Sequence, residues 1–296
     1  MHKAGQNDVS EKMKERTRTM KTITSRKNPD VVFATSLQTK KGRNETGLFP
    51  AEGEKLFLEA SKPENRHLID RVYLSEDESR RLLTLVSSSL GESFVESDRL
   101  TVLPSSVFEK ISSEKSPQGI ITILKSLDIS KKINKINKKE LFAEQSEKTL
   151  ALVSVRDPGN LGAIIRSAVA FGFSSIVMTD DCAELTNPKT VRAAMGGLFR
   201  IRFLCVTDFP SFIREVQSAG RRVLAAELRE GAIPIGKIGL RSDDVVMIGN
   251  EGHGIPVEYS KLADSSVYIP ISERSESLNA AIAASLFLWE ISKAGN

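Results

Sequence analysis

An arginine that follows a glycine-containing turn is the first group in this sequence with a chemical interpretation. The stretch DPGNLGAIIRSA, residues 157–168, predicts a helix that begins near Asn160 and carries Arg166 in its first turns. A cation is disfavoured there because the positive end of the helix dipole is close. Arg166 follows Gly162 by four residues, so its side chain is expected to lie across the glycine.

Glycine costs a helix about 1 kcal/mol relative to alanine. In return, Gly162 is expected to leave open space beside free backbone N–H groups. Space, N–H groups and a guanidinium together suit an anionic or hydroxyl-bearing ligand. The alternative is that Asn160 is only an N-cap and Arg166 only a surface arginine.

A second candidate segment is the glycine-rich stretch IGNEGHGIP, residues 248–256. Three glycines surround Glu251, and Pro256 follows too soon for a dinucleotide-binding motif that opens a helix. The stretch predicts a backbone loop that a ligand approaches closely. His253 lies in this loop and is interpreted as an ordinary loop residue.

The third segment is YIPISERSESLNAAIAAS, residues 268–285, which predicts a strand, a polar loop and a helix. Ser275 or Ser277 is a candidate helix cap, and Asn279 has an ordinary interpretation as a polar helix residue. All three segments follow predicted strands. The carboxyl edge of the strands is where open α/β sheets bind ligands.

The elements that must position these groups alternate between strand and helix through the C-terminal half, which indicates a parallel α/β sheet. The predicted strands are 149–155, 174–180, 199–206, 221–228, 243–249 and 265–271. The predicted helices lie around 160–170, 188–195, 209–220 and 275–292. In the first of these helices, a buried stripe is expected at Leu161, Ile164, Ile165, Ala168 and Val169.

Composition divides the chain into four parts. Residues 1–20 are charged and predict a disordered tail. Residues 21–126 alternate short apolar runs with polar turns and predict a smaller mixed α/β domain. Residues 127–148 are rich in Lys, Asn and Glu and predict a linker with some helical tendency. Residues 149–296 form the α/β domain that carries the three candidate segments.

Net charge and cysteine content restrict the possible functions less than the three segments do. The net charge of +4 fits an anionic partner without requiring one. Cys182 and Cys205 form no CxxC motif, so neither a disulfide framework nor a zinc knuckle is expected, and a reducing, cytoplasmic location is the default. No apolar run is long enough for a membrane span, and residues 1–20 lack the apolar core of a secretory signal. The histidines show no metal-ligand spacing.

The three segments resemble, in order, the motifs of the SpoU (TrmH-like) family of RNA ribose 2′-O-methyltransferases, part of the SPOUT superfamily. The patterns are N-x-G-x-x-x-R, then G-x-E-x-x-G, then an Ile-Pro pair followed by Ser-Leu-Asn. The matching residues are Asn160, Gly162, Arg166, Gly249, Glu251, Gly254, Ile269, Pro270, Ser277, Leu278 and Asn279. More diffusely, segments such as NPDVV and RVYLSE resemble the family's substrate-binding domain, which has a ribosomal L30e-like fold.

The resemblance implies that the C-terminal α/β domain contains a deep trefoil knot, a rare topology. It also implies a pocket for S-adenosylmethionine (AdoMet) and no metal. The residues implied to hold this cofactor are Gly249, Gly254, Ile269, Leu278 and, on a neighbouring strand end, Ala226. A homodimer is implied as well. The final helix, with Leu278, Ile282, Leu286 and Trp289 at helical spacing, is expected to supply either interface or core.

Ribose methylation gives the polar residues their implied roles. A 2′-hydroxyl must be aligned with the methyl–sulfur bond and must lose its proton. Arg166 is the family's catalytic arginine. Because arginine stays protonated, an orienting role toward hydroxyl and phosphate is favoured over proton acceptance. Glu251 is expected to orient Arg166, while Asn160, Ser277 and Asn279 line the ribose side.

The RNA contacts expected beyond the active site are basic. Arg192 is a candidate phosphate contact, with a surface arginine as the alternative. Lys27, Lys41 and Arg43 are expected on an RNA-binding face. The implied substrate is 23S ribosomal RNA. A tRNA 2′-O-methyltransferase, a non-catalytic AdoMet- and RNA-binding protein, and a base N-methyltransferase remain as alternatives.

Overall fold

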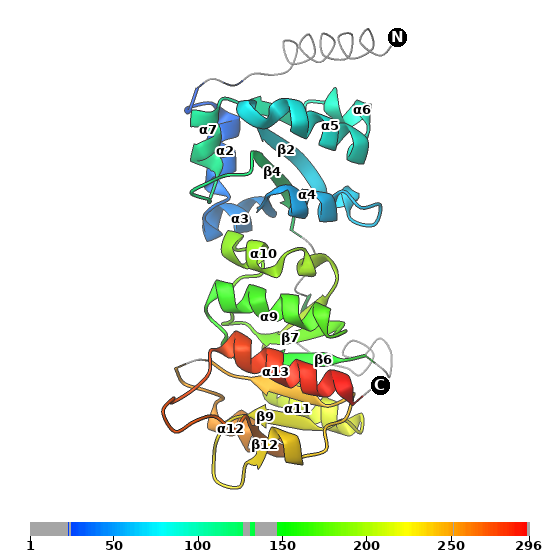
Figure 1. Ribbon diagram of the computed structural model, residues 1–296, viewed down its shortest axis with the longest axis vertical. Coiled ribbons are helices and arrows are strands. Elements are labelled where there is room, and N and C mark those ends of the chain that lie inside the picture. The colour runs from blue at the N-terminus through cyan, green and yellow to red at the C-terminus, as the bar shows by residue number, and fades with distance from the viewer. Residues whose placement is uncertain (1–22, 24, 127–130, 134–146, 251, 295–296) are drawn as a thin grey trace. The chain divides into compact units, whose positions relative to one another are not determined.

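The chain folds into two compact units, one on each side of the Ser126–Leu127 bond (Figure 1). The computed structural model describes residues 23, 25–126, 131–133, 147–250 and 252–294. The predicted tail 1–20 and most of the predicted linker lie outside these residues. Both units combine helices with a sheet, so the prediction of two α/β domains is confirmed.

The N-terminal unit is built on a mixed four-stranded sheet in the order β1-β4-β2-β3. Strands β1 and β2 run antiparallel to β4, and β2 runs parallel to β3. The strands are β1 (Leu48–Glu52), β2 (Ile69–Ser75), β3 (Leu100–Leu103) and β4 (Ile120–Lys125). The helices are α2 (Pro29–Ser36), α3 (Lys40–Thr46), α4 (Glu54–Ala60), α5 (Ser79–Leu90), α6 (Glu92–Val95) and α7 (Ser105–Ile111), with short 3-10 turns η1 (Arg66–Leu68) and η2 (Glu76–Glu78).

The core of this unit lies between the sheet and helices α2 and α7. Side chains from α2, α7, β2 and β4 form one apolar cluster around the fully buried Tyr73 and Phe108. Helix α2 starts cleanly because the side chain of Asn28 caps the backbone N–H of Asp30 and Pro29 occupies the first turn.

The C-terminal unit is built on an eight-stranded sheet in the order β10-β12-β9-β11-β6-β7-β8-β5, and every paired strand in it is parallel. The strands are β5 (Lys131–Ile133), β6 (Thr149–Leu152), β7 (Ser175–Thr179), β8 (Arg202–Val206), β9 (Val223–Ala226), β10 (Ile233–Pro234), β11 (Val245–Ile248) and β12 (Ser265–Tyr268). Residues 131–133, predicted as linker, instead form an edge strand beside β8.

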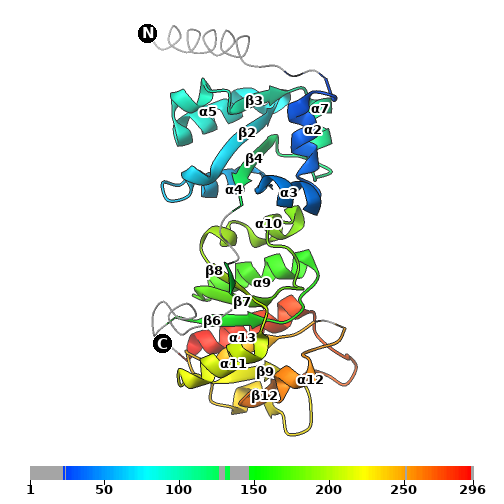
Figure 2. The same ribbon diagram turned by 180° about the vertical axis from the view of Figure 1, so that it is seen from behind.

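Helices cover both faces of this sheet (Figures 1 and 2). They are α9 (Pro158–Ala170), α10 (Pro188–Ala194), α11 (Phe209–Ser218), α12 (Val257–Ser260) and α13 (Ala280–Lys293), with 3-10 turns η3 (Gly197–Phe199) and η4 (Ile235–Lys237). The central strands are apolar runs buried along their whole length, as β11 shows, because both of their faces are covered. The expected α9 stripe is confirmed: four of its members are buried and Val169 is half-buried.

The order of the strands brings the three candidate segments together. Strand β11 lies between β9 and β6, and β12 lies on the other side of β9. The chain leaves β6, β11 and β12 at their carboxyl ends, which share one edge of the parallel sheet. The loop after β9 reaches the same edge between them. Within the described parts of the chain, no helix is both long and apolar enough to cross a membrane.

Candidate active site

Helix α9 begins at Pro158, two residues earlier than predicted. Its cap is Asp157, whose Oδ1 accepts the backbone N–H of Asn160 at 2.8 Å, while Oδ2 accepts from Lys189 Nζ at 3.0 Å. The backbone N–H of Asn160 and then the Lys189 ammonium lower the pKa of the Asp157 carboxyl. Asp157, not Asn160, is therefore the cap of α9.

Gly162 does not leave open space, contrary to the prediction. It is buried against α10, and a Cβ built on it would lie 2.5 Å from the Cβ of Ala193 and 2.6 Å from the carbonyl oxygen of Thr190. Only glycine allows α9 and α10 to pack this closely. The function of Gly162 is thus to let α10 approach, not to admit a ligand at that position.

Arg166 is the ninth of the 13 residues of α9, not part of its first turns. The dipole of a helix acts within its terminal turns, so the predicted conflict between the arginine and the helix N-terminus is wrong. Arg166 is exposed and forms no hydrogen bond or ion pair with any other residue that the structure describes. Its guanidinium is therefore accessible to a ligand.

The second segment folds into a tight loop after β11. Asn250 and Gly254 exchange two backbone hydrogen bonds, of 3.1 and 2.9 Å, which close the loop on itself. Gly254 adopts a left-handed φ of 66°. Gly249 packs so closely on this turn that a Cβ would lie 2.5 Å from the carbonyl carbon of Gly254. Glu251 lies outside the described residues, and His253 is exposed.

Asn250 joins this loop to the chain that leaves β6. Its Nδ2 donates to the carbonyl of Ser154 at 2.9 Å, and its Oδ1 accepts the backbone N–H of Gly252 at 2.9 Å. Ser154 has a left-handed φ of 55°, and its own N–H donates to Thr179 Oγ1 at 2.9 Å. Asn250 thus links the loop after β11 to the loop after β6, and Ser154 in turn links the loop after β6 to the end of β7. No local pattern in the sequence pointed to Asn250.

The third segment meets the first through a pair of asparagines. Asn279 caps α13, since its Oδ1 accepts the backbone N–H groups of Ala281 at 2.9 Å and Ile282 at 3.4 Å. Its Nδ2 donates to Asn160 Oδ1 at 2.9 Å. Neither Ser275 nor Ser277 caps the helix, so both candidate caps were wrong. A second bond, between the hydroxyls of Ser167 and Ser285 at 2.8 Å, fastens α9 to α13 further along.

Ser277 and Leu278 precede the cap at the same edge of the sheet. Ser277 is exposed, and its carbonyl accepts the hydroxyl of Ser275 at 3.1 Å. Leu278 and Ile269 are half-buried. The structure therefore brings Asn160 into direct contact with Asn279 and leaves the neighbouring Ser277 exposed.

The loop after β9 is held to two neighbouring elements by a carboxylate. Ala226 ends the strand, and the next residue, Glu227, accepts the hydroxyls of Ser266, at 2.7 Å, and of Ser260. Arg229 donates to that same hydroxyl of Ser260. The carboxylate of Glu227 thereby links the end of β9 to α12 and β12. The sequence held no signal that distinguished Glu227 from a surface glutamate.

Apolar side chains are exposed at this edge. Leu228 is 78% exposed and Ile271 is 39% exposed, and they follow β9 and β12 respectively. Large apolar side chains that follow two neighbouring strands suit a ligand with an apolar surface. Among the described residues, no group of three or more His, Cys, Asp or Glu could hold a metal ion.

The basic residues predicted to contact RNA differ in accessibility. Arg192, on α10, and Lys27 and Lys41, in the N-terminal unit, are exposed. Arg43 is only 4% exposed, and its guanidinium donates to the carbonyls of Leu37 at 2.9 Å and Gln38 at 3.0 Å. The prediction of an RNA contact for Arg43 is therefore wrong, because the side chain is buried and hydrogen-bonded to the turn after α2.

The comparison with known families agrees with these motifs. Residues 147–289 match the SpoU rRNA Methylase family, and residues 28–122 match the MRM3-like substrate binding domain. The chain belongs to the SpoU rRNA methylase family.

Similar proteins share both units. The chain is 31% identical over 272 residues to the 23S rRNA (guanosine(2553)-2′-O)-methyltransferase RlmP of Bacillus subtilis. The matched region covers 92% of this chain and 99% of the relative. The chain is 29% identical over 185 residues to the 23S rRNA (guanosine-2′-O-)-methyltransferase RlmB of Acinetobacter baylyi, 62% of this chain and 73% of that one. The crystal structure of an AdoMet-bound rRNA methyltransferase from Sinorhizobium meliloti superposes with a TM-score of 0.74 at 31% identity, over 92% of this chain and 97% of that chain.

Proposed function

We propose that this protein transfers the methyl group of AdoMet to a ribose 2′-hydroxyl of 23S ribosomal RNA. The observation that carries the proposal is the 2.9 Å hydrogen bond from Asn279 to Asn160, which joins the first and third motifs at the edge where the second motif loop also ends. The rRNA methyltransferases of Bacillus subtilis and Sinorhizobium meliloti support the substrate and the cofactor.

The cofactor pocket is assigned to the loops after β9, β11 and β12. Backbone groups near Ala226, Gly249, Ile269 and Leu278 would hold the polar parts of AdoMet, with Gly254 shaping the second loop. The exposed side chain of Leu228 fits the apolar surface that adenine and methionine would present. When bound, AdoMet supplies a methyl group activated on a sulfonium.

Arg166 is proposed to orient the reacting hydroxyl and the adjacent phosphate. Its guanidinium has no partner among the described residues and presents a planar fork of donors. Because arginine stays protonated, the hydroxyl proton would pass to the phosphate or to water, not to Arg166. Glu251 is proposed to orient Arg166, and Asn160, Asn279 and Ser277 are proposed to line the ribose side. Alignment of this kind supplies several kcal/mol of the barrier.

A second copy of the chain is proposed to cover α13. Ile282, Leu286 and Trp289 lie on this helix and are 53%, 39% and 49% exposed, so the alternative of a purely internal core does not hold for them. Phe171 packs against Trp289 with 5.7 Å between ring centroids and an interplanar angle of 57°, next to the same apolar surface. A homodimer would bury it.

A deep trefoil knot is proposed for the C-terminal unit. Strand β11 lies between β9 and β6, β12 lies on the other side of β9, and α13 packs on α9. Family membership supports the knot, and also an L30e-like fold for the N-terminal unit.

The two units are proposed to divide the work. Residues 21–126 would bind RNA, with Lys27 and Lys41 as phosphate contacts. Residues 149–296 would bind AdoMet and form the dimer, with Arg192 as a further phosphate contact, and residues 127–148 would connect the two. The contacts with phosphate predict an affinity that falls with salt.

The test of the proposed function is a map of 2′-O-methyl groups. Unmodified 23S rRNA and bulk tRNA would each be incubated with the purified protein and labelled AdoMet. Methyl incorporation at a single ribose of 23S rRNA, with none in tRNA, is expected. Incorporation into tRNA alone, or into a base, would overturn the proposal.

A further inference from the structure

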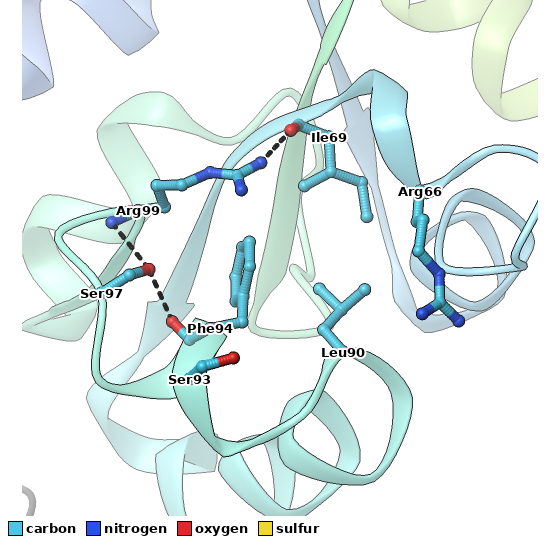
Figure 3. Close-up of a pocket in the computed structure, with 7 residues that line it drawn as sticks. All are labelled: Arg66, Ile69, Leu90, Ser93, Phe94, Ser97 and Arg99. Carbon is cyan, nitrogen blue, oxygen red and sulfur yellow. Dashed lines mark hydrogen bonds between the residues drawn. The ribbon is translucent and has the colours of Figure 1, made fainter.

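A pocket in the N-terminal unit combines arginine, serine and apolar side chains in a way that the active site does not use (Figure 3). It has a volume of about 260 Å³ and lies between the ends of α5 and α6 and the starts of β2 and β3. The residues that line it are Arg66, Ile69, Leu90, Ser93, Phe94, Ser97 and Arg99. None of the seven is acidic.

Arg99 is a fixed cation on one side of this pocket. Its Nε donates to the carbonyl of Asp70 at 2.8 Å, and its Nη2 donates to the carbonyl of Ile69, where β2 is irregular. The guanidinium carbon lies 4.8 Å from the centre of the Phe94 ring. The carbonyl bonds and the ring hold the guanidinium plane in one orientation, so it presents a flat, positively charged surface.

Arg66 lies on the opposite side of Phe94 and Leu90 from Arg99 (Figure 3). It is exposed and forms no hydrogen bond or ion pair with the residues that the structure describes. Arg66 therefore lies across the apolar floor from the anchored Arg99, and no acidic side chain lines the pocket to compensate their positive charge. An anionic group is therefore the favoured occupant.

The remaining lining narrows the ligand class. Leu90 is half-buried and gives the floor most of its accessible apolar surface, because Ile69 and Phe94 are only 1% and 9% exposed. Ser97 is committed, because its hydroxyl donates to the carbonyl of Phe94 at 2.7 Å and accepts the N–H of Arg99 at 3.3 Å. Ser93 is exposed and its hydroxyl has no partner among the described residues, so it can bond a base edge or a ribose hydroxyl.

We propose that this pocket takes one unstacked nucleotide of the RNA substrate, with its base against Leu90 and the small accessible part of Phe94 and its flanking phosphates at Arg66 and Arg99. A nucleotide inside a chain carries a phosphate on either side of its ribose, which matches cations on opposite sides of the floor. Proteins read single-stranded RNA by stacking splayed bases on aromatic rings and guanidinium planes. The volume is just below the range of about 300–1,000 Å³ for drug-sized ligands, so a single nucleotide fits and a helical segment does not.

This inference rests on the proposed function for the RNA, and its test uses the full-length protein. The variants are Arg66→Ala and Ser93→Trp, which remove one cation and fill the pocket. Both residues are exposed, so folding is expected to be unaffected. The matched control is Arg80→Ala, which removes an exposed arginine from α5 outside the pocket.

The measurements are filter binding to a 23S rRNA transcript over a salt series, AdoMet affinity by calorimetry, and methyl transfer. Arg66→Ala is expected to raise Kd for the transcript about 5- to 10-fold and to reduce the salt slope by about one. Ser93→Trp is expected to raise Kd with an unchanged slope. For both pocket variants, the AdoMet affinity and the kcat at saturating RNA are expected to match those of wild type. The control Arg80→Ala is expected to match wild type in all three measurements.

The outcomes separate this inference from the proposed function. Wild-type methyl transfer to 23S rRNA establishes the latter in the same samples. If wild type methylates and both pocket variants bind the transcript like wild type, the pocket is not an RNA site. Adenosine 5′-monophosphate serves as the free-nucleotide probe. Micromolar binding of it, lost in Arg66→Ala without a change in RNA affinity, would overturn the inference in favour of a small nucleotide.

Discussion

Replacement of Asn279 separates the two tasks that this side chain performs. Its Oδ1 caps α13, and its Nδ2 bonds Asn160. Loss of a helix cap costs about 0.5–2 kcal/mol, and loss of a neutral, exposed hydrogen bond adds about 0.5–1.5 kcal/mol. Asn279→Ala is therefore expected to destabilise the protein by about 1–3.5 kcal/mol.

The informative variants keep the cap and remove the bond to Asn160. Asn279→Asp retains an acceptor at the helix N-terminus, where its charge is favourable, but it has no amide donor for Asn160. Asn279→Ser retains a capping hydroxyl without adding charge. Both keep a cap and lose only the bond to Asn160, so they are expected to be destabilised in urea by no more than about 0.5–1.5 kcal/mol. Both are expected to lose methyl transfer by roughly 10²-fold, the scale of a small misplacement at a reacting centre.

The assay is methyl incorporation into 23S rRNA beside urea denaturation of the same samples. The neutral variant controls for repulsion between aspartate and RNA. Wild-type kcat in Asn279→Ser would refute the reasoning, because the link between the first and third motifs would then be irrelevant to the reaction. Loss of activity with a matching loss of folded protein would refute it too.

The remaining predictions concern the packing of α9, the loop after β9 and the cofactor. Gly162→Ala is expected to destabilise the protein in denaturant titration. Its Cβ would lie 2.5 Å from that of Ala193, and this overpacking costs about 1–3 kcal/mol, against about 1 kcal/mol gained in helix propensity. A more stable variant would contradict the contact. Glu227→Ala is expected to raise KM for AdoMet more than it lowers kcat, with partial recovery in Glu227→Gln, whose amide oxygen still accepts from serine; an unchanged KM would show that the loop needs no such anchor. AdoMet binding measured by calorimetry is expected to survive exhaustive chelation, and its loss would demonstrate a required metal.

The sequence predicted the elements of the C-terminal unit well because their patterns are strong. Buried parallel strands are short apolar runs, and α9 and α13 carry apolar residues at helical spacing. The two-residue β10 and the edge strand β5 have no such pattern. Strand β5 is polar, and only its pairing with β8 makes it a strand.

The sequence indicated which residues gather near the candidate site better than it indicated what each of them does. Gly162 was expected to make room for a ligand, and its actual neighbour, α10, is about 30 positions further along the chain. The order Asp157–Pro158 is a signature of a helix start that the sequence did offer. It would have placed Arg166 beyond the middle of α9 and removed the dipole argument.

Contacts between distant segments account for the other differences. Arg43 is as basic as its exposed neighbours, and only the fold of the turn after α2 buries it. Asn250 links two loops, and Glu227 links the end of β9 to α12 and β12. Such links depend on strand order, which no local pattern specifies.

The most direct test of the central claim is methyl transfer to 23S rRNA by Arg166→Ala. Arg166 has no structural partner among the described residues, so the variant is expected to fold and to bind AdoMet like wild type. Its kcat is expected to fall by roughly 10²-fold or more, the scale seen when one positioned electrostatic group is removed, and Arg166→Lys should recover little because an ammonium lacks the planar fork. Full activity in Arg166→Ala would contradict the account and leave Arg166 a surface residue.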